Sequence, residues 1–431
     1  MPTSSNSTIP SINQLNDLLE SAKPFLRQEF EKADEKLPSL ISILQSAGAG
    51  ECFHRLGTFL DHLLHVYRII KLWKAPDCVA LCALFHSVYS NSYSNIVLFD
   101  PQTTDGRQTV RDHIGDNAER LAHLFCILHR QSLIHKQIMC QFTEAELIGE
   151  YLQESKISLA NANEKGIFSN EEKWRKKIQS LVPENGVMGR HYKTGEEITV
   201  SRRMIGVFLL MTLADISEQY FGFQDVLYDN SNGRLELIGS RYDTLYPGNG
   251  KPGLWMNAAS RMAAVYMLLV REETILMCEN KRGCGNHRDE DIELVVTTLI
   301  PPVFEKCSKI LDASDQIKAR DLYWEVVCDD GCDQVKKDKG EEMLAKCIEL
   351  NPYVGEPHVL LGQFYLSKGR FEEGEKEVEK GLSLLLEWGC SWDKRISWEG
   401  WVAWCRVMLN QAKDKSWPQT AWGVINLGLV N

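Results

Sequence analysis

The segment LGTFLDHLLHVYRIIKLW (residues 56–73) decides the fold class, because its apolar residues recur three and four positions apart. This spacing gives a helix one continuous apolar face, which must pack against a core. The segments AERLAHLFCILHR (118–130) and RMIGVFLLMTLADISEQYF (203–221) have the same spacing. We therefore predict a mostly α-helical protein, with no parallel sheet between residues 50 and 130.

Alternation of apolar and polar residues, which is typical of strands, is scarce in this chain. The best candidate for a strand or hairpin is HYKTGEEITVSRR (191–203), with a turn at Thr194-Gly195. Proline and glycine gather in SRYDTLYPGNGKPGLW (240–255), and polar residues gather in RGCGNHRDEDIE (282–293). We expect both segments to be loops, and the first is long enough to be functional.

Composition argues against several classes of protein. Of the 431 residues, 44% are apolar and 25% are charged, which is ordinary for a globular chain of two or three domains. The formal net charge is −11 and there is no long basic run, so we expect no nucleic-acid partner. No apolar run is long enough to cross a bilayer, so we expect no membrane partner.

Cysteine usage and the N-terminus bear on the compartment. The 13 cysteines are scattered, without paired CxxC motifs at zinc-ribbon spacing, which favours free thiols in a reducing compartment. The first residues, MPTSSNSTIPSINQ (1–14), lack the charged start and apolar core of a secretory signal. We expect a cytoplasmic protein with a flexible N-terminal tail.

Three regions are expected along the chain. An N-terminal tail and helix (1–45) precede a large helical domain (46–310). After it, LNPYVGEPHVLLGQFYLSKGRFEEGEKEVEKGLSLL (350–385) has the spacing of a tetratricopeptide unit, in which small residues let two helices approach closely. Residues 311–431 are therefore expected to form a short tetratricopeptide-like helical array, which is a candidate surface for a protein partner.

Contacts within this array can also be predicted. The Leu361–Tyr365 face should pack against the Phe371–Val378 helix as an antiparallel pair. Trp398, Trp401 and Trp404 recur at three-residue spacing and share one face of a helix. We expect these rings to be mostly buried as an anchor, since exposed rings would indicate a stripe for a ligand.

Three stretches carry the residues with the clearest chemical potential. His62 lies on the helical segment quoted first, and ALFHSVYSN (83–91) contains His86. Asp215 follows the apolar run of the third helical segment. A carboxylate in such a place is costly unless a partner compensates its charge, and a metal ion would be such a partner.

Together these stretches resemble the HD-domain superfamily, and within it the hydrolase domain of the bifunctional guanosine tetraphosphate synthetase/hydrolases, over about residues 45–225. That family has a histidine in a context like HLLHV, then Leu-His-Asp after the next helix, then Leu-Ala-Asp followed four residues later by asparagine. The counterparts here are His62, Phe85-His86-Ser87, Leu213-Ala214-Asp215 and Gln219. The resemblance implies a helical HD-like domain in which His62, His86 and Asp215 bind a divalent metal ion.

The chain departs from that family at the acidic positions. Ser87 stands where the family has the aspartate of its His-Asp doublet, and Ser90-Asn91 replace an acidic pair that helps to activate water. Neither Ser90 nor Asn91 can act as a general base near neutral pH. The pattern GTFLDHL followed by LFHSVYSN is similar instead to a domain family of unknown function found in plants and microbes, which implies no activity.

Two histidines and one aspartate leave several coordination positions of a metal ion open. Such a set suits a catalytic zinc with bound water or an iron(II) site of the facial-triad type, and manganese is a further candidate. His54 lies about two helical turns before His62 and is a candidate fourth ligand. Asp61 or Ser87 could orient a ligand ring.

Basic and polar residues near these motifs are candidates for contacts to a small anionic substrate, for example a phosphorylated one. Some follow His86 in the chain, and some precede the helix that carries Asp215. Glu218 and Gln219 lie one turn beyond Asp215, where they could contact metal-bound water or the hydroxyls of a ribose-like group. The predicted substrate-binding residues are Arg55, Tyr89, Asn91, Lys193, Arg202, Arg203 and Gln219.

Three functions fit these patterns. A metal-dependent enzyme of HD type, with His-Ser in place of His-Asp, would act on a small anionic substrate. A non-haem iron oxygenase could use the same three ligands. A non-catalytic adaptor or nucleotide sensor would hold a protein partner on its repeats. Metal content separates the adaptor from the two enzymes, and oxygen dependence separates the two enzymes.

Overall fold

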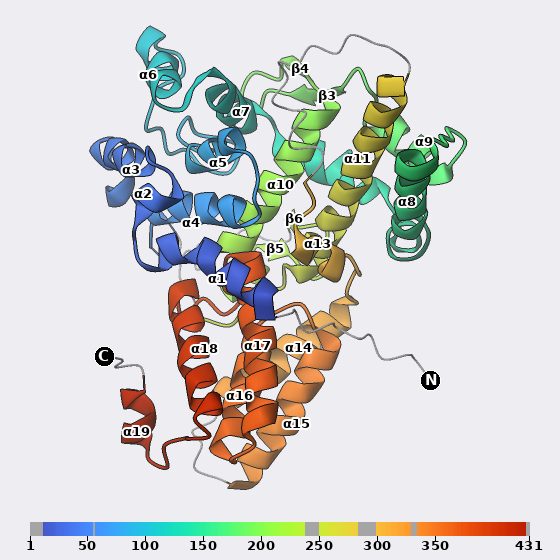
Figure 1. Ribbon diagram of the computed structural model, residues 1–431. Helices are drawn as coiled ribbons and strands as arrows, with labels where there is room; N and C mark the ends of the chain where they lie inside the picture. The colour runs from blue at the N-terminus through green and yellow to red at the C-terminus, as the bar shows by residue number, and fades with distance from the viewer. Residues whose placement is uncertain (1–11, 55–56, 238–249, 283–298, 329–333, 428–431) are drawn as a thin grey trace.

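The computed structural model describes residues 12–54, 57–237, 250–282, 299–328 and 334–427 (Figure 1). Helices dominate this part of the chain, and its strands form three two-stranded antiparallel hairpins. The prediction of a mostly α-helical protein is therefore confirmed. Among the described residues between 50 and 130, no parallel sheet occurs.

The upper half of the molecule in Figure 1 contains the helices up to α13 and the three hairpins. Its helices are α1 (Ile12–Leu26), α2 (Phe30–Ala33), α3 (Leu37–Ser46), α4 (Phe59–Leu72), α5 (Asp77–Leu84), α6 (Thr104–Ile114), α7 (Asp116–Ile127), α8 (Tyr151–Ala160), α9 (Lys173–Leu181), α10 (Arg202–Gln219), α11 (Met256–Arg282) and α13 (Pro302–Cys307). Its hairpins are β1 (Phe53–His54) with β2 (Gly57–Thr58), β3 (Val187–Arg190) with β4 (Glu197–Val200), and β5 (Tyr228–Asp229) with β6 (Glu236–Leu237).

Helix α10 is the core helix of this half. All its residues from Met204 to Ser217 are buried, and it packs against both α4 and α11. Its sequence is apolar on every side, which is typical of a helix enclosed by others. Ser201 caps its start by accepting a hydrogen bond from the amide of Met204. The buried length of α10 is what carries Asp215 into the interior.

The hairpin expected at 191–203 is present, but it begins earlier in the chain. Strand β3 lies before the quoted segment, and Arg190 pairs with Glu197 across the hairpin. The connecting loop includes Gly195, whose φ of 75° is readily accessible to glycine. The second strand ends at Val200, because the next residue already caps α10.

Other expected segments fall largely outside the described residues. Of the loop expected at 240–255 only residues 250–255 are described, and of that at 282–293 only Arg282. The tail expected at the N-terminus is outside the description up to residue 11. After it, helices α1, α2 and α3 follow one another where we expected a single helix.

The lower half is a succession of helices that pack on their neighbours in the chain. These are α14 (Ala313–Val327), α15 (Gln334–Leu350), α16 (Glu356–Ser367), α17 (Phe371–Trp388) and α18 (Trp398–Lys413), followed by the short α19 (Ala421–Asn426). The predicted packing of α16 on α17 is confirmed. A Cβ at Gly362 would lie 2.5 Å from Val378, and one at Gly374 would lie 2.8 Å from Leu366, so glycine allows this close approach.

The tryptophans at the start of α18 are anchors, as expected. Trp398 and Trp401 are each 3% exposed, and their indole nitrogens donate to the carbonyls of Leu385 and Asp393. Trp404 is only partly buried and donates to the side chain of Gln363. These rings join α18 to the helices before it, which favours a structural role over a ligand stripe.

Aromatic packing joins the two halves. The ring of Trp73, just after α4, packs edge-on against Trp388 and Phe304, and its indole nitrogen donates to the carbonyl of Glu387. Trp255 also packs against Trp388. The end of α17 therefore lies inside the upper half, close to α4.

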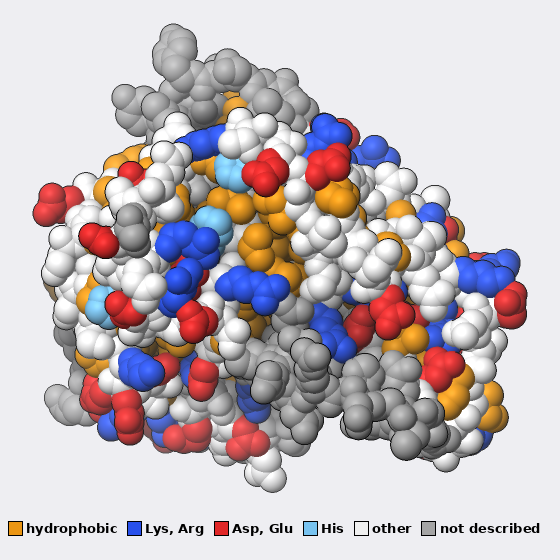
Figure 2. Space-filling view, turned by 90° about the horizontal axis from the view of Figure 1, so that it is seen from above, with side chains coloured by type: hydrophobic (Ala, Val, Ile, Leu, Met, Phe, Trp, Pro, Cys, Tyr) orange, Lys and Arg blue, Asp and Glu red, His pale blue; other side chains and the backbone are white. Residues whose placement is uncertain are grey.

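The surface charges and the cysteines of the structure can be compared with what the composition predicts. The face shown in Figure 2 mixes acidic and basic side chains around a central group of hydrophobic ones, and its coloured atoms form no continuous basic patch. The cysteines that the structure describes all have free thiols. Within the described ranges, no helix has a stretch that is both long and apolar enough to cross a bilayer.

Candidate metal centre

His62 is positioned by the start of α4. The helix begins at Phe59 because Thr58 and Asp61 form a capping box, in which each side chain accepts a hydrogen bond from the other residue's amide. Asp61 is thus part of the cap, and its expected role in orienting the ring of a ligand stays a prediction. His62 follows directly, on the buried face of the helix, and is 4% exposed.

His86 lies just beyond the end of α5. The helix is closed by Phe85, and the turn that follows directs the His86 ring inward, so that it is 1% exposed. Its Nδ1 lies 2.7 Å from the carbonyl oxygen of Ala83, to which it donates. The thiol of Cys126 donates to the backbone carbonyl of His86. The carbonyl of Ala83 therefore fixes the ring of His86, and the thiol of Cys126 fixes its backbone.

The side chains of His62, His86 and Asp215 converge. The two Nε2 atoms are 3.2 Å apart, and they lie 3.4 Å and 3.7 Å from Oδ1 of Asp215. Three atoms with these separations can all lie about 2.1 Å from one central ion, the usual length of a bond from zinc to nitrogen or oxygen. The predicted convergence is confirmed: this buried His-His-Asp group could hold a metal ion.

Hydrogen bonds select the ring nitrogens that face the centre. Nδ1 of His62 lies 2.5 Å from Oε2 of Glu218, and Nδ1 of His86 donates to a carbonyl. Each Nδ1 therefore carries the proton, and each Nε2 presents a lone pair toward the other ring and toward Asp215. A histidine that binds a metal is commonly held this way, by a carboxylate or a carbonyl on its other nitrogen.

Protonation of these groups suits a ligand set. Burial lowers the pKa of His86 to about 4, so the ring is neutral near pH 7. Burial alone would raise the pKa of Asp215, but coulombic interactions with His86, His62 and Arg130 outweigh the effect of burial, so that the pKa is lowered. Glu218 is likewise held well below its ordinary pKa by His62 and His65, against the effect of burial. Neutral imidazole and ionised carboxylate are the forms that bind metals.

Residues around Asp215 include one that the sequence analysis missed. Arg130 is 2% exposed, and its guanidinium lies 3.5 Å from Oδ2 of Asp215. Gln219 donates to Oδ1 of Asp215 at 2.7 Å and so holds this carboxylate, while its predicted contact with a substrate stays a prediction. A signal for Arg130 was available, since it is a charged residue at the end of the apolar segment 118–130.

The loop after His86 is organised by its polar residues. Ser87 is 5% exposed, and its hydroxyl accepts a hydrogen bond from the side-chain amide of Asn91 at 2.7 Å. The other end of the Asn91 side chain accepts from the amides of Tyr93 and Ser94. Tyr89 donates to Glu119. Asn91 and Tyr89 thus have structural partners, and their proposed contacts with a substrate stay predictions.

The basic residues expected near the site lie elsewhere. Arg202 and Arg203 begin α10, and both approach Glu273 of α11, roughly 20 Å along the helix from Asp215. Lys193 is exposed in the β3–β4 loop, near the ring of Tyr192. The structure does not bring these three to the His-His-Asp group. Arg55 lies outside the described residues.

His54 lies beside the group and not within it. Its ring stacks on that of His62, with ring centroids 4.2 Å apart. The group whose ligand atoms all lie within 4.8 Å of one another contains only His62, His86 and Asp215 among the described residues. The placement of His54 therefore favours a role as a neighbour of a ligand, and its role as a fourth ligand stays a prediction.

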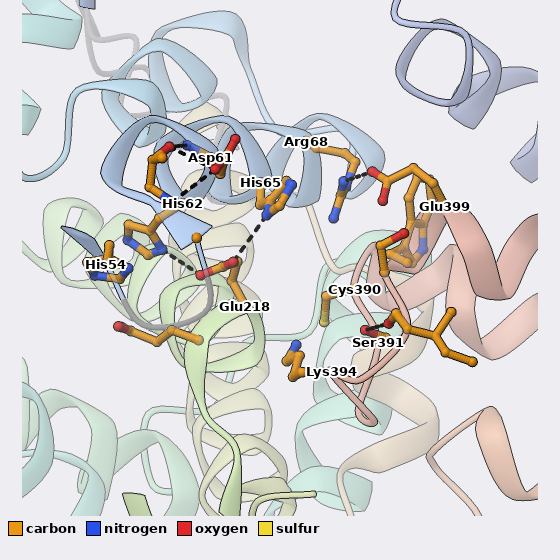
Figure 3. Close-up of a pocket in the computed structure, with 16 residues that line it drawn as sticks. His54, Asp61, His62, His65, Arg68, Glu218, Cys390, Ser391, Lys394 and Glu399 are labelled. Atoms are coloured by element: carbon orange, nitrogen blue, oxygen red, sulfur yellow. Dashed lines mark hydrogen bonds and ion pairs between the residues drawn. The ribbon is translucent and has the colours of Figure 1, made fainter. Parts of the chain in front are cut away.

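A cavity of about 230 Å³ opens next to the group (Figure 3). One side is formed by α4 and the end of α10, and the other by residues 390–399 from the lower half. Figure 3 shows Glu218 between His62 and His65, with Lys394 and Ser391 across the cavity. His86 and Asp215 do not line it, so the cavity meets the group at His62, with Gln219 also in its wall.

Charged side chains of both signs line this cavity. The ammonium of Lys394 donates to the carbonyl of Ser217, and Arg68 pairs with Glu399. His65 is about a third exposed and lies 3.2 Å from Glu218. The lower half thus contributes one wall of the cavity beside the candidate metal centre. An array that only bound a protein partner would not need to form part of this cavity. A protein partner for the lower half stays a prediction.

Comparison with known families gives a local match. The profile of a family described as "Domain of unknown function (DUF6817)" matches residues 43–130. This range contains His62 and His86 but ends before Asp215. No curated protein and no solved structure matches the chain.

Proposed function

We propose that this protein is a metal-dependent hydrolase of the HD type, in which His62, His86 and Asp215 bind one divalent ion. One observation carries the proposal. Two Nε2 lone pairs and one carboxylate oxygen face a common point, while the protons of both rings are engaged on the opposite side. Such atoms repel one another unless a cation lies between them. Two nitrogens and one oxygen suit zinc first, with manganese and iron as alternatives.

The residues around the centre have distinct roles in this proposal. A bound ion would lower the pKa of its water toward neutrality and so provide a nucleophile for hydrolysis. Glu218 fixes the ring of His62, and Gln219 fixes the carboxylate of Asp215. Ser87 supplies no negative charge, and its hydroxyl is engaged with Asn91. Activation of water therefore depends on the ion and not on a carboxylate at position 87.

The adjoining cavity suggests the substrate class. Its volume of about 230 Å³ is below the usual range of ligand sites, which favours a small substrate. Lys394, His65 and Arg68 bring cationic or protonatable groups to its walls. We propose a small anionic substrate, such as a phosphate monoester, which extends from this cavity toward His62.

Metal analysis tests the proposal directly. Purified protein should contain about one equivalent of divalent metal, and His86→Ala should lose it, because one of three ligands is removed. His129→Ala is a matched control, since His129 is exposed and is not one of the three proposed ligands. Hydrolysis of p-nitrophenyl phosphate should fall with metal content. A His86→Ala protein that retains its full metal content would contradict the assignment.

An iron oxygenase is the second candidate, because the same donor set also suits iron(II). Two histidines and one carboxylate are the ligands of the non-haem iron(II) oxygenases. Reconstitution of metal-free protein with iron(II) or zinc separates the two functions. Turnover that consumes oxygen with iron alone would favour the oxygenase, and turnover with zinc under nitrogen would favour the hydrolase.

A further inference from the structure

Arg130 lacks a carboxylate of its own. Its guanidinium is stacked 3.8 Å from the ring centre of Phe125 and makes one long contact, 3.5 Å, with Asp215. Its Nε is buried and has no hydrogen-bond partner. Buried arginine normally satisfies several of its five N–H donors, so these donors are available to a further acceptor.

Two other buried arginines of this protein have both carboxylate and carbonyl acceptors. Arg175 makes two hydrogen bonds to Glu272 and one to the carbonyl of Ser169. Arg202 donates to the carbonyl of Val182 and pairs with Glu273. Arg130 alone among these three shares its carboxylate with the candidate metal centre. Arg261 also has a buried Nε without a hydrogen-bond partner, but its other nitrogens donate to the carbonyl of Phe142 and to the side chain of Glu144. Arg130 differs because its one carboxylate contact is with a residue of the candidate metal centre.

The charges around the candidate metal centre also favour the binding of an anion. The guanidinium of Arg130 lies beside Asp215, whose carboxylate also lies close to both histidines of the candidate metal centre. A divalent ion at this centre would lie near the buried guanidinium, so that two cations would share the carboxylate of Asp215. Burial of an uncompensated charge is costly, because it loses its hydration.

We infer that the metal ion and an oxyanion bind to this centre as a pair, with the oxyanion on an open position of the metal and on the guanidinium of Arg130. The inference rests on the proposed metal binding and makes it more specific. A tetrahedral oxyanion, such as the phosphate group of a monoester, provides both the negative charge and several acceptors. Its oxygens match the donors of a guanidinium, which binds phosphate by two parallel hydrogen bonds.

The coupling can be measured without turnover. Zinc is titrated into metal-free protein in sodium sulfate and, at equal ionic strength, in sodium perchlorate, which coordinates metals weakly. Sulfate stands for the tetrahedral oxyanion. We expect zinc to bind about tenfold more tightly in sulfate, within the usual range of coupling between sites. Arg130→Gln should reduce this ratio to about one, because the shared partner of the anion is lost.

Controls separate a local effect from a change in net charge. Arg190→Gln removes an exposed cation of β3, 71% exposed at its side chain, and should keep the full sulfate effect. Arg130→Lys keeps the charge but loses the planar fork, so it should retain only part of the coupling. It also serves if Arg130→Gln fails to fold, since thermal melts of each variant are recorded first.

Each outcome has a defined meaning. Equal zinc affinity of the wild type in both salts would overturn the inference and leave metal binding intact, with hydroxide as the compensating charge. A sulfate effect that survives in folded Arg130→Gln or Arg130→Lys at full size would show that another group holds the anion. Absence of zinc binding in either salt would overturn the proposed function itself, and the inference with it.

Discussion

Glu218 holds His62 from the side opposite to the candidate metal centre. Its Oε2 lies 2.5 Å from Nδ1 of the ring, and Nε2 of the same ring faces His86 and Asp215. The carboxylate therefore determines both the ring's orientation and which nitrogen has the free lone pair. Because Glu218 also contacts His65 in the adjoining cavity, one side chain connects the cavity with the centre.

Replacement of Glu218 by glutamine should weaken metal binding without abolishing it. The amide oxygen can still accept from Nδ1, but the negative charge that makes the ring a stronger donor is lost. We expect the zinc dissociation constant to rise by about 10- to 100-fold, the usual cost of losing such a partner. Competition with a chromogenic chelator measures it. Glu399→Gln, in the same cavity but paired with Arg68, should bind zinc like the wild type. An unchanged constant in Glu218→Gln would contradict this role.

Ser87 should matter for stability and not for metal binding. In Ser87→Ala, the buried amide of Asn91 loses its acceptor, which should lower the free energy of unfolding by about 1 to 2 kcal/mol. Metal content should stay that of the wild type, because the hydroxyl is engaged within its loop. Denaturant unfolding and metal analysis of one preparation give both values. Loss of metal from a folded Ser87→Ala protein would mean that the hydroxyl is a ligand.

Much of the helical architecture follows from local pattern. Apolar spacing alone predicts α4, α7 and α10, because each must bury one or more faces. The exact start of the β3–β4 hairpin could not be predicted from the sequence. Strand β3 is short, and its residues show little alternation of apolar and polar side chains. Helices α1 to α3 were expected as one, although Pro38 in the first turn of α3 is a signal for a new helix start.

The site was predictable where it depends on residue order and not where it depends on tertiary contact. His62, His86 and Asp215 were identified from their contexts in sequence. Glu218 was expected near bound water or substrate, yet it contacts His62, 156 positions away in the chain. Arg130 reaches Asp215 across 85 positions. No local pattern encodes such contacts, because they arise only when α4, α7 and α10 assemble.

The close approach of α16 and α17 gives a stability prediction. In Gly362→Ala the new methyl group would lie 2.5 Å from a methyl carbon of Val378, so the helices must separate. We expect a loss of about 1 to 3 kcal/mol in the free energy of unfolding. Gly206→Ala is the matched control in α10, because its Cβ meets no atom within 4 Å. That change should be neutral or stabilising by up to about 1 kcal/mol. Equal effects of the two substitutions would mean that helix contact is not the cause.

Glu356 should make the protein less stable as the pH rises from about 4.5 to 7. This carboxyl group is 1% exposed and accepts hydrogen bonds from the amides of Trp392 and Asp393, which lie between the cavity residues Ser391 and Lys394. Burial, together with the charge of Asp393, raises its pKa to about 7, against an ordinary value of 4.5. The folded protein therefore holds this proton more tightly than the unfolded chain. The contribution of this bound proton to the free energy of unfolding is complete below pH 4.5. It is lost as the pH rises to 7, and the free energy of unfolding falls by up to about 3 kcal/mol.

Comparison of two glutamine variants isolates this effect. Glu356→Gln cannot ionise, so its free energy of unfolding should fall less than that of the wild type between pH 4.5 and 7, measured by urea unfolding. Glu377→Gln tests the opposite sign: burial opposes ionisation there, but the hydrogen bond with His358 lowers the pKa of Glu377 to about 2. Glutamine at 377 should therefore remove stability that the wild type has above pH 4.5. If Glu356→Gln keeps the wild-type slope across this interval, the carboxyl group is already ionised in the folded protein, and its contacts with the amides of residues 392 and 393 are those of a carboxylate.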